Sequence, residues 1–410
     1  LSRVSMIEEG WEKQVRMPFL SIVGSHTTNG VAALHTELLK ETIFRDFYNL
    51  FPERFQNKTN GITPRLWLRC ANPELAELIS DHIGSDWITD LDKLEELIDL
   101  SSKESFQHQW QEVKKLKKQQ LCDWITTTHK VELVVDSLFD VQVKRIHEYK
   151  RQLLNILHVV HLYDQLRKNP KMKVLKRTFL FGGKAAPGYY MAKQIIRLIN
   201  DVAKKVNKDV EIEDRLRVLF VTNYGVSSSE KIIAASEVSE HISTAGTEAS
   251  GTSNMKFSLN GCILLGTHDG ATIEIGEEVG SENIFTFGMK ANDVQQLRAN
   301  GYDPQQIYND NPRVKNVLDL VGSGFFNPQE PQRYRDLIDS LIYNDHYLLL
   351  ADFDSYAACQ ELVGKTYQDV PAWTQMSIAN TAKVGKFSSD RTIREYATQI
   401  WNVHPLHHGR

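Results

Sequence analysis

From about Leu133 onward, short apolar runs alternate with longer stretches that place apolar side chains at helical spacing. Residues 139–146 alternate apolar and polar side chains, as a strand does, and residues 147–168 carry leucines and valines three or four positions apart. The apolar run 178–181 predicts a second strand, and residues 187–207 predict a helix with a proline in its first turn. This part of the chain therefore predicts strand followed by helix, repeatedly.

The same order continues to about residue 275. Residues 216–222 predict a buried strand, Ser227–Ser229 the start of a helix that runs on from Glu230, and residues 263–265 and 271–275 continue the pattern. Such alternation predicts an α/β fold with a mostly parallel sheet covered by helices on both faces. Ligands of these sheets bind beyond the carboxyl ends of the strands. The segments expected there are 144–150, 182–188, 223–229 and 245–256.

The first 130 residues follow a different pattern. An apolar run at 19–23 and a turn-forming stretch precede a predicted helix at about 31–51. Residues 52–64 are rich in proline, asparagine and glycine, which makes them the best domain boundary before the middle of the chain. Residues 65–130 are predicted to be helical, and their lysine run is expected to form a solvated helix face. These lysines are Lys114, Lys115, Lys117 and Lys118.

Composition and charge fit an ordinary globular protein. The 410 residues are 41% hydrophobic and 24% charged, which suffices for large cores and suggests two to three domains. A formal net charge of −4 supports neither a nucleic-acid nor a membrane partner, and no run approaches the roughly 18 apolar residues of a spanning helix. The fourteen histidines show no metal-ligand spacing, so we expect no catalytic metal.

The cysteines and the first residue bear on the setting of the chain. Four cysteines lie far apart without CxxC pairs, which favours reduced thiols and a cytoplasmic compartment. The sequence opens with Leu1 rather than Met, in the middle of an amphipathic stretch. We therefore expect an N-terminal portion to precede it.

The first candidate for chemistry is Glu-Ala-Ser-Gly-Thr-Ser-Asn-Met-Lys (residues 248–256), which leads into a predicted helix that Gly261 would end. The free N–H groups of a first helical turn suit a phosphate, Gly251 lets the backbone approach it, and Thr252 adds a hydroxyl. Lys256 lies four residues after Thr252, on the same face about one turn later. A cofactor with a phosphate arm and an aldehyde could span that gap and attach to Lys256. A capped helix with a surface lysine is the alternative.

The second candidate is a basic cluster at the strand-to-helix junction 143–151. Two phosphates held side by side would require such a cluster, because fixed cations must offset their repulsion. Arg145 could fork onto one phosphate, while Lys144 and Lys150 act as point charges. A solvated helix start or an RNA-contacting patch is the alternative. The basic side chains are Lys144, Arg145, His147, Lys150 and Arg151.

Two further turn-forming segments carry less information. Phe-Gly-Gly-Lys-Ala-Ala-Pro-Gly (residues 181–188) is not a P-loop, because Ala185 follows its lysine and no glycine stands at the required distance upstream. It predicts a tight strand-to-helix turn instead. In Asn-Lys-Thr-Asn-Gly-Ile-Thr-Pro-Arg (residues 57–65), Asn60 could hydrogen-bond a sugar hydroxyl or could simply form a turn.

Together these motifs resemble those of the α-glucan phosphorylases, the family that acts on glycogen, starch and maltodextrin. Residues 248–257 are similar to the family's pyridoxal-phosphate attachment signature. Other segments match the family in order and spacing, and the resemblance covers essentially all 410 residues as the C-terminal half of such an enzyme. These other segments are 55–65, 139–152, 182–188 and 385–391.

The resemblance implies a GT-B glycosyltransferase fold, in which the active site lies between two Rossmann-like domains. Residues 1–60 would end the N-terminal domain, residues 61–386 would form the cofactor-binding domain, and residues 387–410 would return to the N-terminal domain as a final helix at about 392–401. Members of the family are typically homodimers.

The reaction implied is reversible phosphorolysis of terminal α-1,4-linked glucose, which gives glucose 1-phosphate with retention. The partners implied are an α-1,4-glucan and inorganic phosphate or glucose 1-phosphate, and the cofactor implied is pyridoxal 5'-phosphate. The cofactor's phosphate would pass a proton to and from the substrate phosphate, since a second phosphate pKa of about 6 suits neutral pH.

Residue roles implied by the resemblance fall into three sets. The catalytic set is Arg145, Lys150 and Lys256, with Lys256 as the cofactor's anchor. The cofactor-binding set is Lys256, Gly251, Thr252, Lys144, Tyr224 and Trp67. The substrate-binding set is Asn60, Glu248, Ser250, Gly251, Tyr149, Arg145 and Lys150.

Departures from the family leave two other functions open. The chain has half the family's length and carries Gly225 where animal members carry arginine. A catalytically inert cofactor-binding fragment is therefore the first alternative. A pyridoxal enzyme of amino-acid metabolism is the second, although the acidic partner for the pyridine nitrogen and the carboxylate-binding arginine that it needs are not evident.

Overall fold

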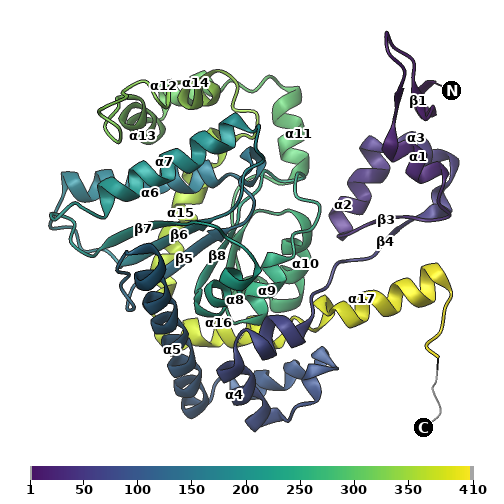
Figure 1. The fold of residues 1–410 in the computed structure, drawn as a ribbon, viewed down its shortest axis with the longest axis horizontal. Coiled ribbons are helices and arrows are strands. Elements are labelled where there is room, and N and C mark those ends of the chain that lie inside the picture. Colours follow the sequence, from purple (N-terminus) through teal and green to yellow (C-terminus); the bar gives the residue numbers. More distant parts are fainter. Residues whose placement is uncertain (1, 407–410) are drawn as a thin grey trace.

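The computed structural model describes residues 2–406, so Leu1 and residues 407–410, which belong to the predicted segments 1–60 and 387–410, lie outside it. Its larger part is built on a six-stranded parallel sheet with the order β10-β9-β8-β5-β6-β7 (Figure 1). The predicted α/β class with a Rossmann-like sheet is confirmed. The strands are β5 (Leu138–Val143), β6 (Arg177–Gly182), β7 (Leu216–Val221), β8 (Val238–His241), β9 (Ile263–Gly266) and β10 (Phe285–Thr286).

The strand order reverses between β5 and β8. The chain runs outward from β5 through β6 to β7, returns to the other side of β5 as β8, and continues outward through β9 to β10. The helices that connect the strands before the reversal therefore cover one face, and the connecting helices that come after it cover the other. The crevice for a ligand forms at the carboxyl ends of the two strands that flank the reversal.

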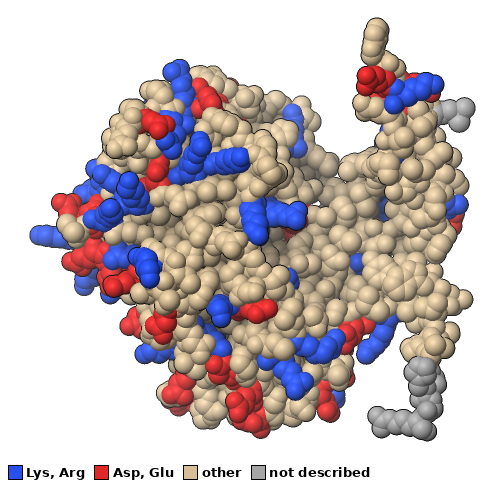
Figure 2. All heavy atoms as spheres, in the orientation of Figure 1, with Lys and Arg blue, Asp and Glu red and all other residues tan. Residues whose placement is uncertain are grey.

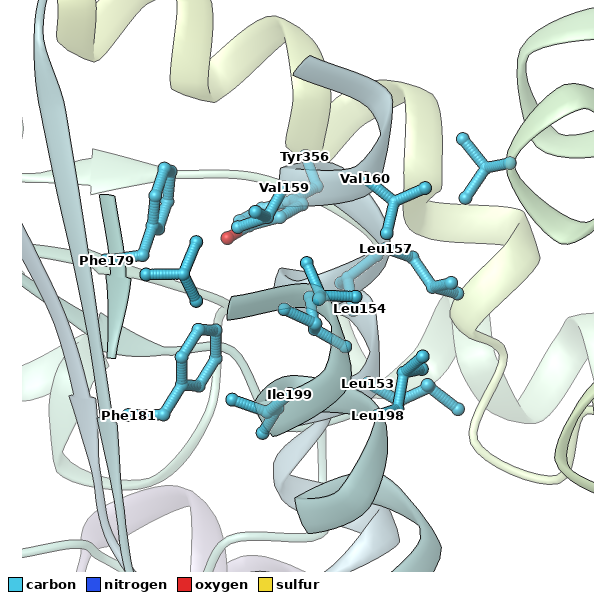
Figure 3. Packing of buried hydrophobic residues seen from close by; sticks show 14 of the residues in the cluster. Leu153, Leu154, Leu157, Val159, Val160, Phe179, Phe181, Leu198, Ile199 and Tyr356 are labelled. Atoms are coloured by element: carbon cyan, nitrogen blue, oxygen red, sulfur yellow. The ribbon is translucent and has the colours of Figure 1, made fainter. Parts of the chain in front are cut away.

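One face of the sheet packs against α6 (Gln152–Lys168) and α7 (Tyr190–Val206). Figure 3 shows their leucines and isoleucines meeting the rings of Phe179 and Phe181 on β6, with Tyr356 of α15 alongside. Further helices complete this layer through the same core. They are α13 (Pro312–Gly322), α14 (Arg335–Tyr343) and α15 (Leu349–Tyr367), and α11 (Ala291–Ala299) and α12 (Pro304–Asp310) precede them in the chain.

The opposite face packs against a second apolar core, to which β5 contributes Phe139, Val141 and Val143. Its long helix α5 (Glu104–His129) lies against α8, so the predicted helical region 65–130 contributes directly to this layer. The helices of the layer are α4 (Pro73–Ile83), α5, α8 (Val226–Ala235), α9 (Ser253–Leu259), α10 (Gly270–Val279) and α16 (Val370–Ala382).

The alternation of apolar and polar residues along β5 does not reflect a solvated face, because all six residues of the strand are buried. Its polar side chains instead enter a buried network. Asp140 accepts from Gln360 Nε2 at 3.1 Å, and Gln142 accepts from Asn155 Nδ2 at 3.1 Å. A buried polar group needs such a partner. The alternation along β5 therefore separates side chains in an apolar core from side chains in a buried polar network, and neither set faces solvent.

The lysine run on α5 is a correction to the sequence analysis. Lys114, Lys117 and Lys118 are buried, and only Lys115 is exposed. Lys114 Nζ donates to the carbonyl oxygens of Ala234, Ser236 and Asn260 at 3.3, 2.7 and 3.2 Å. Lys118 Nζ pairs with Glu237 at 2.9 Å. The Lys114 ammonium thus satisfies carbonyls at the ends of α8 and α9, where helices leave acceptors unpaired.

Some element boundaries also differ from the prediction. The helix expected over 187–207 begins at Tyr190, because residues 183–189 form the turn that leaves β6. The helix expected at about 31–51 is divided into α2 (Ala33–Leu38), a π-helical turn (Leu39–Ile43) and α3 (Arg45–Leu50). The serines at 227–229 lie in the first turn of α8, as predicted, and the helix begins one residue earlier, at Val226.

The N-terminal residues form a separate lobe that the end of the chain crosses (Figure 1). This lobe contains the parallel strands β3 (Thr28–Gly30) and β4 (Phe55–Asn57). The final helix α17 (Ser389–Tyr396), which continues as a π-helical turn to Trp401, contacts it through hydrogen bonds from Asn29 Nδ2 to the Tyr396 hydroxyl at 2.8 Å and from Arg391 Nη2 to the Thr59 carbonyl at 2.6 Å. The lobe also contains α1 (Met17–Val23), α2 and α3.

The surface of the larger part carries both signs of charge, whereas the face of the N-terminal lobe shown in Figure 2 is largely uncharged. Across residues 2–406, no helix is both long enough and apolar enough to cross a bilayer.

Candidate active site

The segments that follow β5 and β6 meet at the carboxyl edge of the sheet. Lys144 donates its backbone N–H to the Gly182 carbonyl at 2.9 Å, which extends the β5–β6 ladder by one residue. A Cβ at Gly183 would collide with the Lys144 carbonyl oxygen, so only glycine allows this approach. Tyr224, after β7, lies against the same place, with a ring carbon 3.5 Å from where a Cβ on Gly182 would lie. The turn predicted after Phe181 therefore fixes the position of Lys144.

The basic segment after β5 contacts the acidic residue of the 248–256 motif. Lys150 Nζ forms an ion pair with Glu248, and the Tyr149 hydroxyl donates to the same carboxylate at 3.3 Å. The backbone of Tyr149 also accepts from Thr244 N at 3.2 Å. Burial alone would lower the pKa of Lys150, but Glu248 raises it overall. Two motifs about a hundred residues apart in sequence thus form one polar cluster, as the parallel-sheet rule predicts.

A buried carboxylate that the sequence analysis did not single out holds the Glu248 loop in place. Asp269 accepts from the backbone N–H groups of Gly246 and Glu248 at 2.9 and 2.8 Å and from the Ser243 hydroxyl at 2.7 Å. Burial raises its pKa to about 6, against the hydrogen bonds that favour the carboxylate. Since it follows β9, Asp269 is the residue that ties the β8 and β9 loops together.

Lys144 lies at the reversal point of the sheet, next to His241 at the end of β8. Its Nζ is 3.2 Å from His241 Nδ1, and His241 Nε2 is 2.6 Å from the Ser239 hydroxyl. Burial lowers the pKa of His241 well below its usual range, so the ring is neutral and accepts from the lysine at Nδ1. The sequence analysis missed His241, whose only signal is its place at the end of a short strand.

The electrostatic surroundings of Lys144 favour an anion. Burial, and then the charge of Lys150, lower the pKa of Lys144 to about 7, although Glu248 and Glu240 oppose this shift. A partly buried ammonium beside a neutral imidazole lacks a full counter-charge. A bound phosphate would supply it, and Arg145, whose side chain is exposed at the same turn, could contribute a second cation.

The lowered pKa of Lys144 predicts that the thermal stability of the protein depends on pH. Below pH 7 the buried Lys144 carries its proton at full energetic cost, and the cost shrinks as pH rises toward about 10, where the unfolded lysine also loses its proton. The ligand-free protein should therefore gain thermal stability between pH 7 and 9.5 relative to Lys144→Met. Melting midpoints of both proteins, with the exposed Lys184→Met as control, measure the difference. Parallel curves for wild type and Lys144→Met would contradict the assignment.

Lys256 lies on α9, and its amine rests beside an aromatic ring. Its Nζ is 3.8 Å from the centroid of the Trp67 ring, and burial lowers its pKa. A lysine with a depressed pKa is a better nucleophile toward a carbonyl carbon than a solvated one. Gly251, with φ +71°, and Thr252 lead into this helix, and Gly261, with φ +68°, follows its end as predicted. A carbonyl compound with an anionic arm fits these side chains.

Two residues of the predicted sugar site have other contacts. Ser250 is buried, and its hydroxyl donates to the Gly251 carbonyl at 2.8 Å, so its side chain is already engaged. Asn60 lies in the segment that leaves the N-terminal lobe, where its backbone bonds to Val31 and Arg391. The described contacts do not join Asn60 to the Lys150–Glu248 pair.

Comparison with known proteins gives a family match and several similar proteins. The model of the carbohydrate phosphorylase family matches residues 1–403. The chain is 54% identical over 406 residues to a glycogen phosphorylase of Synechocystis, and 51% and 50% identical over 405 residues to the muscle forms of glycogen phosphorylase from Ovis aries and Homo sapiens. Each match covers 99% of this chain and 48% of the relative. The chain therefore spans about half the length of the curated relatives it matches.

Proposed function

The chain belongs to the carbohydrate phosphorylase family, and we propose that in the whole protein it forms the cofactor-binding half of a glucan phosphorylase active site. The reaction would be reversible phosphorolysis of a terminal α-1,4-linked glucosyl unit. The bond from the anomeric carbon to the glucan oxygen breaks, a phosphate oxygen bonds to that carbon, and the leaving oxygen takes up a proton. The products are glucose 1-phosphate and a glucan shorter by one unit.

The proposal rests on two partly buried lysines of one site. Lys144 follows β5, and Lys256 lies on α9. Lys256 supplies an amine with a lowered pKa and, within residues 2–406, no carboxylate partner, which fits covalent attachment of pyridoxal 5'-phosphate. Lys144, Gly251 and Thr252 would hold its phosphate, and Trp67 and Tyr224 would lie beside the ring. When bound, the cofactor supplies a phosphate that exchanges a proton with the substrate phosphate.

The remaining side chains would bind and orient the substrates. Arg145 and Lys150 would hold the substrate phosphate, because a guanidinium and an ammonium offset the repulsion between two neighbouring phosphates. Glu248 and Tyr149, already fixed by their contacts with each other, would accept and donate hydrogen bonds to glucosyl hydroxyls. Asn60, Ser250 and Gly251 complete the proposed sugar contacts, and the whole protein is proposed to be a homodimer.

Arg145 gives a specific prediction. Because its guanidinium would act on the substrate phosphate and not on the cofactor, Arg145→Ala should lower turnover by about 10²- to 10³-fold and change cofactor affinity by less than about threefold. Steady-state kinetics and titration with pyridoxal 5'-phosphate measure the two effects, and Arg145→Lys separates charge from fork geometry. Equal losses in turnover and in cofactor affinity would contradict this role.

The function itself is tested by glucose 1-phosphate release from a maltooligosaccharide and inorganic phosphate. The chain is loaded with pyridoxal 5'-phosphate and assayed alone, then joined to the part of the Synechocystis relative that it does not cover. Activity in either form supports the proposal. Cofactor binding without activity in both forms would favour the inert-fragment alternative, and transamination of amino acids would favour the other pyridoxal enzymes.

A further inference from the structure

A cavity of about 330 Å³ opens at the amino ends of β6 and β7, at the opposite edge of the sheet from the candidate active site. Arg177 and Leu216, the first residues of these strands, lie in its wall between α6 and α15. Its volume falls within the range of small-molecule sites, which begins at about 300 Å³. None of the roles assigned above involves it.

A buried cation lines this cavity. The Arg177 side chain is 8% exposed, and it donates to the side-chain and backbone oxygens of Gln360, the latter at 2.6 Å. A guanidinium has five N–H donors, so these two hydrogen bonds, its side chain's only ones within residues 2–406, leave three donors for a ligand. The nearest carboxylate oxygen, from Asp140, is 3.8 Å away.

A second polar group in the wall lacks a partner. His158 on α6 is 2% exposed, and among the described residues its Nδ1 has no hydrogen-bond partner. Burial, and then the charge of Arg177, keep its pKa well below the usual range, so the ring is neutral. A neutral imidazole has one N–H donor and one acceptor nitrogen, and either is costly when it is buried without a partner.

Access to Arg177 depends on a glycine within α15. A Cβ at Gly364 would lie 3.0 Å from Arg177 Nη2, so any side chain there would press on the guanidinium. Glycine in a helix interior is less stabilising than alanine, because it loses more backbone freedom on folding. At this position the absence of a side chain keeps the space beside the guanidinium open.

The rest of the cavity is apolar with a mostly basic rim. Its inner wall includes Leu162, Leu166, Val174 and Leu216. The rim carries Lys173, Arg215 and Lys365 against one acid, Glu361. This distribution suits a hydrocarbon body with a negative head.

Two buried carboxyl groups near Arg177 would repel an anionic ligand if both were ionised. Burial raises the pKa of Asp140, and burial together with the charge of Asp140 raises that of Glu240. The pair therefore holds protons more readily than ordinary carboxyls, which leaves the Arg177 charge less compensated.

We propose that this cavity binds a small aliphatic monocarboxylate, with the carboxylate on Arg177 and His158 and the hydrocarbon chain against the leucines of α6. The ligand site is independent of the phosphorylase reaction, so a failure of either proposal leaves the other standing.

Isothermal titration of the 410-residue chain with octanoate, octylamine and octanol tests the proposal. We expect saturable octanoate binding, at least tenfold tighter than that of octylamine or octanol. Gly364→Leu should weaken octanoate at least tenfold, and Leu362→Ala, an exposed change on the same helix, should not. Equal binding of the acid and the amine, or octanoate binding unchanged in Gly364→Leu, would overturn the proposal.

A second variant guards against a folding defect in Gly364→Leu. Lys173→Glu combined with Lys365→Glu alters only exposed side chains at the rim and should weaken octanoate severalfold. The matched control is Lys171→Glu, an exposed lysine in the same loop that does not line the cavity. Equal octanoate affinities in the double variant and the control would overturn the proposal without any change to the core.

Discussion

Lys256→Ala is expected to abolish retention of pyridoxal 5'-phosphate and, with it, glucose 1-phosphate release. The amine of Lys256 rests over the Trp67 ring, and its burial lowers its pKa, so it is suited to covalent attachment of an aldehyde. Covalent attachment keeps the cofactor at a very high effective concentration, about 10⁵–10⁸ M in well-oriented cases. Its loss should weaken cofactor retention by at least about a thousandfold.

The measurement is cofactor that remains on the protein after borohydride treatment and denaturation. Wild type should retain it, whereas Lys256→Ala and Lys256→Arg should not, since arginine keeps the positive charge but offers no primary amine. Lys144→Met serves as a second control, because it removes a proposed phosphate contact without removing the point of attachment. Covalent retention in Lys256→Ala would show that another lysine is the anchor.

Much of the fold could be predicted because the apolar runs are long and separated by clear turns. The strands β5, β6 and β7 each have six residues. Strands β6 and β7 contain the continuous apolar runs typical of buried parallel strands, and β5 has the alternation typical of strands in general. The central strand β8 escaped notice because it has four residues, Val-Ser-Glu-His, of which only one is apolar. Its pairing with β5 and β9 is a tertiary effect that overrides the local pattern.

In the candidate site, too, sequence motifs predicted some contacts, whereas others depend on tertiary packing alone. The meeting of Lys150 with Glu248 follows from the rule that parallel strands end at one edge. His241 and Asp269 were missed because each is a single polar residue, the first at the end of a short strand and the second after one, with no motif around it. The lysines of α5 were predicted to be solvated because a lysine's usual surroundings are water, and the sequence does not show that helix ends would supply carbonyl partners.

The second large effect is expected at Arg151. It is the last residue of the basic cluster, directly after Lys150, and it is fully buried. Its guanidinium pairs with Asp352 at 2.7 Å and donates to the carbonyl oxygens of Ile242 and Ser243 at 2.7 and 3.3 Å. It therefore joins α15 to the start of the loop that carries Glu248. The backbone of Arg151 is left-handed, with φ +55°, as the chain turns into α6.

Arg151→Met should lower the free energy of unfolding by about 3–5 kcal/mol, because it leaves the buried carboxylate of Asp352 without its cation and the carbonyls of Ile242, Ser243 and Leu348 without this donor. Urea unfolding followed by tryptophan fluorescence measures the loss. Combining it with Asp352→Asn removes the unpaired charge, so the double variant should be more stable than Arg151→Met alone. A double variant no more stable than the single one would mean that the ion pair is not what Arg151 contributes. In that case its hydrogen bonds to the 242–243 backbone would carry the effect, and the loop that holds Glu248 would be the part of the fold that Arg151 stabilises.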